Sequence, residues 1–465
     1  VFLPFNPEYN QLMTQHDGRM DSTAQSLSQA VWFRRITRLW WPLAASWLLM
    51  GLEGPAISAV MARLADPEIN LAAFGGVVFP LSLIIEAPVI MLLSASVALS
   101  KDMASYRRIY NFMMVTSAAM TALHALVAFT PLFDVVAGQW MGVPAETLEP
   151  ARTGLRLMLP WTWAIGYRRF QQGAMIRFGY SRAVWVGTLV RLGSGVASLA
   201  LGALLGLPGI VVGAGAQSVG VLSEAVYAGL RMRPILRNEL RAAPPVEPLE
   251  WRPFFRFYIP LALTSLLTLM WQSLGSSAMS RMPLPVESLV VMPALNGLIF
   301  LLRGVGMAYN EVVVALLDQP HSYRPLRRFA LLLAGGLLLL HLLVALTPLS
   351  RGWFQQISAL RPALVEMAVF AFIIAIPVSA LTVFQSLYQG TIVYGRATRG
   401  IPESIIAFLI VFLTVLGVGV ATGQVTGLFM GITALTLANF AQTGWLLLRS
   451  RPVQRALRVR DAGLE

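Results

Sequence analysis

The chain contains a series of apolar runs that are each about as long as a lipid bilayer is thick. A helix needs roughly 20 apolar residues to cross the hydrocarbon core, and only 12% of the 465 residues are charged, about half the share usual in soluble domains. Twelve runs meet this length: residues 39–61, 70–99, 109–132, 153–176, 184–205, 209–230, 256–278, 288–317, 329–349, 363–390, 402–422 and 426–448. The pattern predicts an all-α polytopic membrane protein with 12 transmembrane helices.

Basic residues between the runs predict the orientation of the chain. With the amino terminus inside, 25 of the 35 Lys and Arg residues fall in cytoplasmic segments, six on the opposite side and four within the runs. Cytoplasmic loops are enriched in basic residues, so we expect a multi-pass protein of the plasma (inner) membrane with both termini cytoplasmic. The net charge of +13 then needs no nucleic-acid partner, and none is expected.

The two halves of the chain resemble each other. Residues 123–132 read LHALVAFTPL and residues 340–349 read LHLLVALTPL, which are identical at eight of ten positions and are related by an offset of 217. Pro160 and Pro377 match at the same offset, and the sequence PLA at 42–44 recurs at an offset of 218. Each half has six runs, an even number, so both halves enter the membrane from the same side. The expected result is two parallel six-helix repeats related by an axis along the membrane normal.

The repeat also predicts the domain organisation. We expect a disordered segment over 1–30, an N-terminal six-helix lobe over 31–232, a cytoplasmic connector over 233–252, a C-terminal six-helix lobe over 253–449 and a basic cytoplasmic tail over 450–465. Met20 is a more natural start than Val1, which suggests that residues 1–19 precede the mature protein.

Several segments resemble one family of transporters. The sequences ISAVMARLADPEINLAAFG (57–75), SASVALSKD (94–102) and FQQGAMIRFGYSRAV (170–184) resemble the multidrug and toxin extrusion (MATE) transporters of the multidrug/oligosaccharidyl-lipid/polysaccharide exporter superfamily. Within that superfamily, GLEGPAISAV (51–60) looks closest to the progressive ankylosis protein branch. The resemblance implies a V-shaped bilobal bundle that works by alternating access and is driven by a proton or sodium gradient.

Two charged residues lie near the middle of apolar runs and mark a candidate site. Glu86 in the second run and Arg303 in the eighth are related by the offset of 217, so they occupy equivalent positions with opposite charge. A charge inside the hydrocarbon is costly and therefore indicates function. We expect Arg303 to bind an anionic group of the substrate and Glu86 to serve as its counter-ion or as a proton carrier. The alternative is a buried ion pair that only holds the lobes together.

Glu53 is a second candidate for proton coupling. It lies in the outer half of the first run, where Pro55 and two flanking glycines can open the helix. Proton-coupled MATE transporters often carry an aspartate in this span. The alternative is a glutamate that caps an irregular turn.

The fourth run carries Arg168, Arg169 and Gln172 at its inner half. Consecutive residues of a helix point about 100° apart, so we expect one of the two arginines to line the cavity. For Arg191 and Glu224, in the fifth and sixth runs, a simple packing pair is favoured. Polar residues of the second half add Asn296, Gln385 and Gln389 as cavity candidates, although such amides often only join helices together. His124 and His341, within the repeated decapeptides, are expected to be structural.

These features favour a secondary active transporter, not an enzyme, that exports an organic, anionic or amphiphilic solute and is coupled to protons. A flippase for a lipid-linked or phosphorylated amphiphile is the alternative, with a channel or a membrane-embedded enzyme more distant. The sequence has no cysteine, no histidine cluster and no Walker lysine motif, so we expect no metal and no cofactor beyond a transmembrane proton or other ion gradient. The expected partners are the substrate and the lipid bilayer, and the expected state is a monomer.

Overall fold

The computed structural model describes residues 29–244, 249–395 and 399–462, and every regular element in these ranges is a helix. The expectation of an all-α chain is therefore confirmed. Of the segment predicted to be disordered, 1–28 lies outside the described residues, whereas Gln29 and Ala30 begin helix α2. The predicted tail also differs, because one helix, α20, continues from Gly427 to Ala462 with Pro452 inside it.

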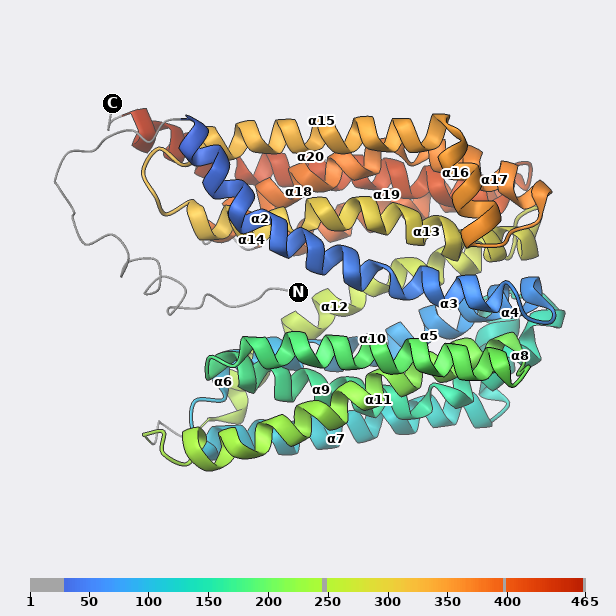
Figure 1. Ribbon diagram of the computed structural model, residues 1–465, viewed down its shortest axis with the longest axis horizontal. Helices are drawn as coiled ribbons and strands as arrows, with labels where there is room; N and C mark the ends of the chain where they lie inside the picture. Colours follow the sequence, from blue (N-terminus) through green and yellow to red (C-terminus); the bar gives the residue numbers. More distant parts are fainter. Residues whose placement is uncertain (1–28, 245–248, 396–398, 463–465) are drawn as a thin grey trace. The chain divides into compact units, whose positions relative to one another are not determined.

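The helices form two compact units. The first unit comprises residues 56–281 and 285–290 of the described chain, and the second comprises 29–55, 282–284 and 291–462. In the first unit, helices α7, α9, α10 and α11 run side by side, and in the second α15, α18, α19 and α20 do so (Figure 1). The units differ from the predicted lobes because the first helices of the two repeats are exchanged. Helix α2 (Gln29–Gly51) belongs to the second unit, and α12 (Trp251–Met279) belongs to the first.

The first unit contains the helices of the N-terminal repeat after the first, together with α12. Its elements are α3 (Glu53–Met61, from Ala56 onward), α4 (Pro67–Ala73), the π-helical turn η1 (Phe74–Val78), α5 (Phe79–Ile90), α6 (Leu92–Leu99), α7 (Met103–Phe129), η2 (Asp134–Trp140), α8 (Ala145–Leu157), α9 (Leu159–Arg177), α10 (Ser181–Leu204), α11 (Gly209–Ile235), η3 (Leu236–Leu240) and α12 (Trp251–Met279). Part of the predicted connector is thus helical, because α11 and η3 continue to Leu240.

The second unit contains α2 and the helices of the C-terminal repeat after α12. Its elements are α2 (Gln29–Gly51), α13 (Pro285–Met307, from Val291 onward), α14 (Tyr309–Leu316), α15 (Tyr323–Leu346), α16 (Pro348–Gly352), η4 (Trp353–Ile357), α17 (Pro362–Ile374), α18 (Ile376–Tyr394), α19 (Gly400–Thr422) and α20. The buried cluster around Tyr309, Phe329 and Leu387 receives Trp32 and Ile36 from α2.

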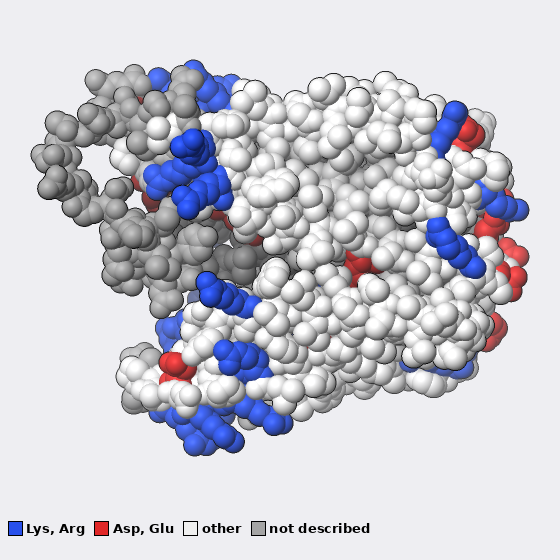
Figure 2. All heavy atoms as spheres, viewed as in Figure 1, with Lys and Arg blue, Asp and Glu red and all other residues white. Residues whose placement is uncertain are grey.

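Nine helical segments of the described chain are long and apolar enough to cross a membrane, or ten if the bent pair α17–α18 counts as one span. They coincide with ten of the twelve predicted runs. The other two runs correspond to α8–α9, which carries Arg168 and Arg169, and to the long helix α20. Figure 2 shows a largely uncharged surface between two ends that carry most of the visible Lys, Arg, Asp and Glu side chains, with one acidic patch near the middle. A surface of this kind suits contact with lipid.

The fourth helix of each repeat is broken at the same place. Helices α8 and α9 meet at Met158, two residues before Pro160, and α17 and α18 meet at Ala375, two residues before Pro377. Proline cannot donate a backbone hydrogen bond and crowds the preceding turn, so the break follows from the sequence.

The histidines of the repeated decapeptides bridge these breaks. His124 Nδ1 lies 2.7 Å from Thr162 Oγ1 and its Nε2 lies 2.9 Å from the Leu155 carbonyl oxygen. His341 makes the equivalent contacts with Ser379 Oγ at 2.8 Å and the Phe372 carbonyl at 3.1 Å. A carbonyl can only accept, so each Nε2 donates and each Nδ1 accepts from a hydroxyl. The prediction that both histidines are structural is confirmed.

Candidate functional site

The first unit contains a buried group of charged side chains, here called the charge cluster: Glu86, Arg168, Arg169, Arg191 and Glu224. They come from four neighbouring helices, α5, α9, α10 and α11. Three arginines and two glutamates leave one positive charge in excess. Buried charges are tolerated where they are paired and hydrogen-bonded, and the partners of each member show how far this condition is met.

Glu224 is the centre of the charge cluster. Its carboxylate is fully buried and accepts from Arg168 Nη1 at 2.5 Å and from Gln172 Nε2 at 2.9 Å. Arg191 Nε lies 3.8 Å from the same carboxylate. The predicted Arg191–Glu224 pair is therefore present, but Arg168 is the closer partner because it lies on the adjoining face of α9.

Glu86, Arg168 and Arg169 are members of the charge cluster that each keep a buried polar atom without a hydrogen-bond partner among the described residues. Glu86 is 2% exposed, and its Oε2 atom has no hydrogen-bond partner among the described residues. The charges that act on Glu86 are those of Arg169 and Arg168. Arg169 is partly accessible, whereas Arg168 is buried against Glu224. Of the two arginines, Arg169 is thus the one that remains available to a ligand.

The second unit carries a neutral counterpart, here called the amide cluster: Gln385, Asn439 and Thr443. Gln385 Nε2 donates to Asn439 Oδ1 and to Thr443 Oγ1, each at 3.1 Å. All three side chains are buried between α18 and α20. The three groups satisfy one another, so the amide cluster joins these helices without a charge.

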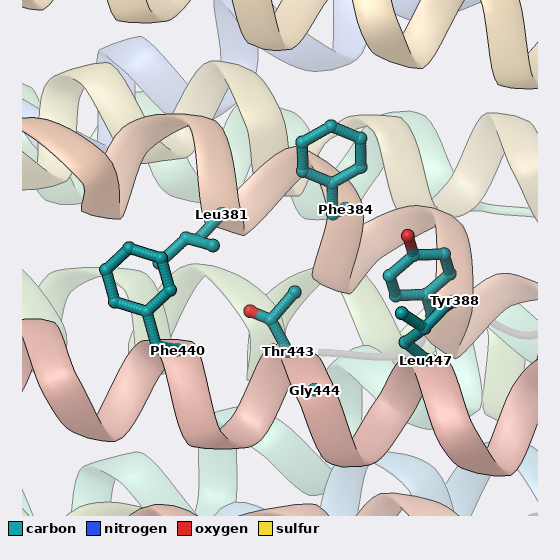
Figure 3. Close-up of a pocket in the computed structure, with 7 residues that line it drawn as sticks. All are labelled: Leu381, Phe384, Tyr388, Phe440, Thr443, Gly444 and Leu447. Atoms are coloured by element: carbon teal, nitrogen blue, oxygen red, sulfur yellow. The ribbon is translucent and has the colours of Figure 1, made fainter.

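An apolar groove of about 250 Å³ lies beside the amide cluster (Figure 3). Its lining comes from α18 and α20, and consists of Leu381, Phe384, Tyr388, Phe440, Thr443, Gly444 and Leu447. Thr443 belongs to both the groove and the amide cluster. Three aromatic rings, with hydroxyls only on Tyr388 and Thr443, suit a flat apolar or acyl group better than a charged one.

Arg303 is the charged residue of the second unit at membrane depth. Its Nε donates to Thr382 Oγ1 at 3.1 Å, and the side chain is partly accessible. The described residues provide no further partner for the two terminal nitrogens. Glu86 lies in the first unit and Arg303 in the second, so their pairing stays a prediction.

The remaining candidates fall in less specific surroundings. Glu53 begins α3 directly after the break at Leu52, which agrees with the expected irregular turn, and is partly accessible. Asn296 and Gln389 are partly accessible and make no side-chain hydrogen bond within the described part of the chain. The sequence did not point to Tyr258, Ser265 or Trp40, whose side chains donate to backbone carbonyls near the two membrane-depth charges.

Solved structures share this arrangement of helices. An inward-facing multidrug resistance MATE transporter superposes with a TM-score of 0.66 at 14% identity, covering 89% of this chain and 98% of that one. The chain has the fold of the MATE transporters. The same fold occurs in the lipid II flippase MurJ in an inward closed conformation, with a TM-score of 0.65 at 12% identity and 90% coverage of both chains.

A third structure with the MATE fold comes from Pyrococcus furiosus. It is described as a transporter whose binding pocket has reversed polarity, which suggested a different function, and it matches with a TM-score of 0.58 at 17% identity over 91% of this chain and 96% of that one. No family model and no curated protein matches the sequence. The similarity therefore lies in the fold, at a level where sequence comparison finds nothing.

Proposed function

We propose that this MATE-fold chain is a secondary active transporter that exports an organic anion in exchange for protons. The observation that carries the proposal is the positive charge held at membrane depth on this fold. Arg169 and Arg303 are partly accessible, and each keeps at least one guanidinium nitrogen that is not hydrogen-bonded to a described residue. Arginine in that state binds carboxylates and phosphates well.

Glu86 is the proposed proton carrier. Its carboxylate is buried within the electrostatic range of the Arg169 and Arg168 guanidinium groups and has an oxygen without a hydrogen-bond partner in the described chain. Gain or loss of one proton there changes the net charge of the charge cluster by one. A change of that size at low dielectric alters the affinity of the cluster for an anion, which links proton movement to substrate movement.

A flippase for a phosphorylated or lipid-linked amphiphile is the second candidate. The fold of MurJ supports it, and so does the apolar groove beside the amide cluster, which offers a surface for an acyl or aromatic group. Both candidates need a site that binds an anion, so Arg303 and Arg169 serve either one.

The test is a transport assay with purified protein in liposomes under an imposed pH gradient. We expect accumulation of a fluorescent organic anion such as carboxyfluorescein, loss of accumulation in Arg303→Ala, and partial activity in Arg303→Lys, which keeps the charge but not the planar fork. Glu86→Gln should retain binding but lose the dependence on the pH gradient. Arg351→Ala is the matched control, because Arg351 is exposed and pairs with the exposed Glu366.

Two outcomes would contradict the leading proposal. If Arg303→Ala and Glu86→Gln both transport like the parent protein, neither residue has the proposed role. If only a short-chain fluorescent phospholipid crosses the membrane, and the soluble anion does not, the flippase is the correct function.

A further inference from the structure

The exchanged first helices each pack on the second span of the other repeat. Helix α12 packs on α5 in the first unit, and α2 packs on α14 and α15 in the second. Residues of α2 and α12 correspond at an offset of 218, as the shared sequence PLA shows. The second helices, α5 and α13, correspond at 217, the offset between Glu86 and Arg303. Contacts of the two exchanged helices can therefore be compared residue by residue.

In the first unit, α12 donates two hydrogen bonds to the backbone just after Glu86. Ser265 Oγ lies 2.6 Å from the Ala87 carbonyl oxygen, and the Tyr258 hydroxyl donates to the Pro88 carbonyl. Both side chains are buried. Helix α5 ends at Ile90, so these carbonyls belong to its last turn and lose their partners within the helix. In a membrane such groups must find donors in the protein, and α12 supplies them.

In the second unit, α2 likewise donates a hydrogen bond to the backbone just after Arg303. Trp40 Nε1 donates to the Val305 carbonyl at 3.0 Å, and α13 ends two residues later at Met307. Trp40 is the counterpart of Tyr258 at an offset of 218, and Val305 is the counterpart of Pro88 at 217. One contact has thus been kept in both units with a different donor side chain.

About two turns further along each exchanged helix, a second residue lies against the position that directly follows the charge. Trp47 is the counterpart of Ser265, and Gly304 is the counterpart of Ala87. A Cβ atom on Gly304 would lie 3.4 Å from Trp47 Cβ, which is an ordinary van der Waals distance, so α2 passes close to the backbone next to Arg303. Both exchanged helices therefore contact the residue that directly follows the charge.

We propose that Tyr258, Ser265 and Trp40 are positioning residues for the two membrane-depth charges. The bonded carbonyls lie one or two residues after Glu86 or Arg303, so holding them fixes the end of the helix and the direction of the charged side chain. In the described part of the chain, the crossings between the units lie at residues 55–56, 281–282, 284–285 and 290–291. Each exchanged helix is consequently continuous in sequence with a segment of the opposite unit. The same helix positions Glu86 or Arg303 in the unit to which it belongs. The transport roles of Glu86 and Arg303 rest on the proposed function, but the positioning itself does not.

The absence of native cysteine allows a direct test in the full-length purified protein. In Glu86→Cys, residue 86 becomes the sole thiol, and its modification by N-ethylmaleimide reports how firmly the end of α5 is held. Adding Tyr258→Phe and Ser265→Ala should accelerate the modification roughly tenfold, the equivalent of about 1.4 kcal/mol of lost hydrogen bonding. Adding Ser265→Thr instead should leave the rate near that of the parent, since it keeps the hydroxyl.

The controls lie on the same two helices. Thr264 and Thr268 donate only to carbonyls of α12 itself and are exposed, so Thr264→Val and Thr268→Val should not change the rate. In the second unit, Trp40→Phe should accelerate modification of Arg303→Cys, whereas Trp41→Phe should not, because Trp41 is 60% exposed.

Equal rates with and without the hydroxyls of α12, or equal effects of the test and control variants, would overturn the proposal. If the double variant of α12 does not fold, the Trp40 and Trp41 pair in the second unit decides the question independently. Loss of anion transport in Arg303→Ala concerns the proposed function alone, since the thiol measurement involves no transport.

Discussion

The charge cluster of the first unit and the amide cluster of the second lie at equivalent helix junctions, α9 with α11 and α18 with α20, and share one corresponding position. Arg168 corresponds to Gln385 at an offset of 217, and Glu224 corresponds to Gln442 at 218. In the first unit a guanidinium meets a carboxylate at 2.5 Å, whereas in the second an amide bonds to Asn439 and Thr443 at 3.1 Å. The same helix junction is therefore held by charge in one unit and by neutral groups in the other.

The contacts that the units share are mainly contacts to the backbone. The histidine bridges, the helix breaks before proline and the bonds of the exchanged helices all satisfy main-chain groups that proline or a helix end leaves without partners. Such groups are equally costly in both units, so their partners are kept. Contacts between side chains carry no such obligation. The histidine–hydroxyl bonds are kept in both units, whereas the side-chain contacts between α9 and α11 and between α18 and α20 have diverged. The charged junction lies beside Glu86 and the neutral one beside the apolar groove, which divides the proposed tasks between the units.

The largest effect on the free energy of unfolding is expected from the loss of one charge at the junction of α9 and α11. Glu224→Gln leaves Arg168 and Arg191 without their carboxylate and should lower the free energy of unfolding by about 3–5 kcal/mol. Combining it with Arg168→Gln, which copies Gln385 and Gln442 of the second unit, should recover part of the loss. Thermal unfolding of the purified variants in detergent measures both effects.

An exposed ion pair provides the control for this change. Glu366→Gln removes the carboxylate of the Arg351–Glu366 pair, whose side chains are 59% and 63% exposed, and should cost less than about 1 kcal/mol. If Glu224→Gln is as harmless as Glu366→Gln, the charge cluster is not buried as described.

A smaller difference is expected at two equivalent glycines. A Cβ atom on Gly173 would lie 2.4 Å from the Leu93 carbonyl oxygen, which is backbone, whereas one on Gly390 would lie 2.6 Å from the Val313 side chain. Overpacking costs about 1–3 kcal/mol, and we expect Gly173→Ala near the upper end and Gly390→Ala near the lower, because Val313 can move more easily than a helix backbone. Gly335→Ala, with no atom within 4 Å, serves as the control in the same unfolding measurement. The reverse order would mean that α6 yields more readily than a valine side chain.

The smallest difference in the free energy of unfolding is expected between the alanine variants of the two histidines. His124→Ala and His341→Ala each leave a buried hydroxyl and a carbonyl with one partner fewer, so each should cost about 1–3 kcal/mol. The two values should agree within about 0.5 kcal/mol and add in the double variant, since the sites are independent. Thr162→Val and Ser379→Ala remove one bond of each bridge and should have roughly half the effect. A large inequality would show that the bridges are not equivalent.

Much of the fold could be predicted because it depends on local sequence. Apolar length predicted the helices, and the constant offset between the halves made His124 and His341, and Pro160 and Pro377, equivalent before any contact was known. The structure then showed that the two prolines follow breaks at Met158 and Ala375. The candidate site could be predicted only as a set of residues. Arg168 and Arg169 are adjacent in sequence, and only the packing of α9 against α11 determines that Arg168 pairs with Glu224 while Arg169 stays accessible.

The sequence by itself thus determined which segments are helices, where they break and which residues of the two halves correspond, because these follow from hydropathy and backbone chemistry along the chain. Only the tertiary structure decided that the first helices are exchanged between the units, and that Tyr258, Ser265 and Trp40 bond to the turns beside Glu86 and Arg303. An apolar helix can pack on any apolar surface of sufficient length. The helix on which it packs is determined by the few side-chain donors that bond to an unpaired backbone carbonyl, and these bonds form only in the folded protein.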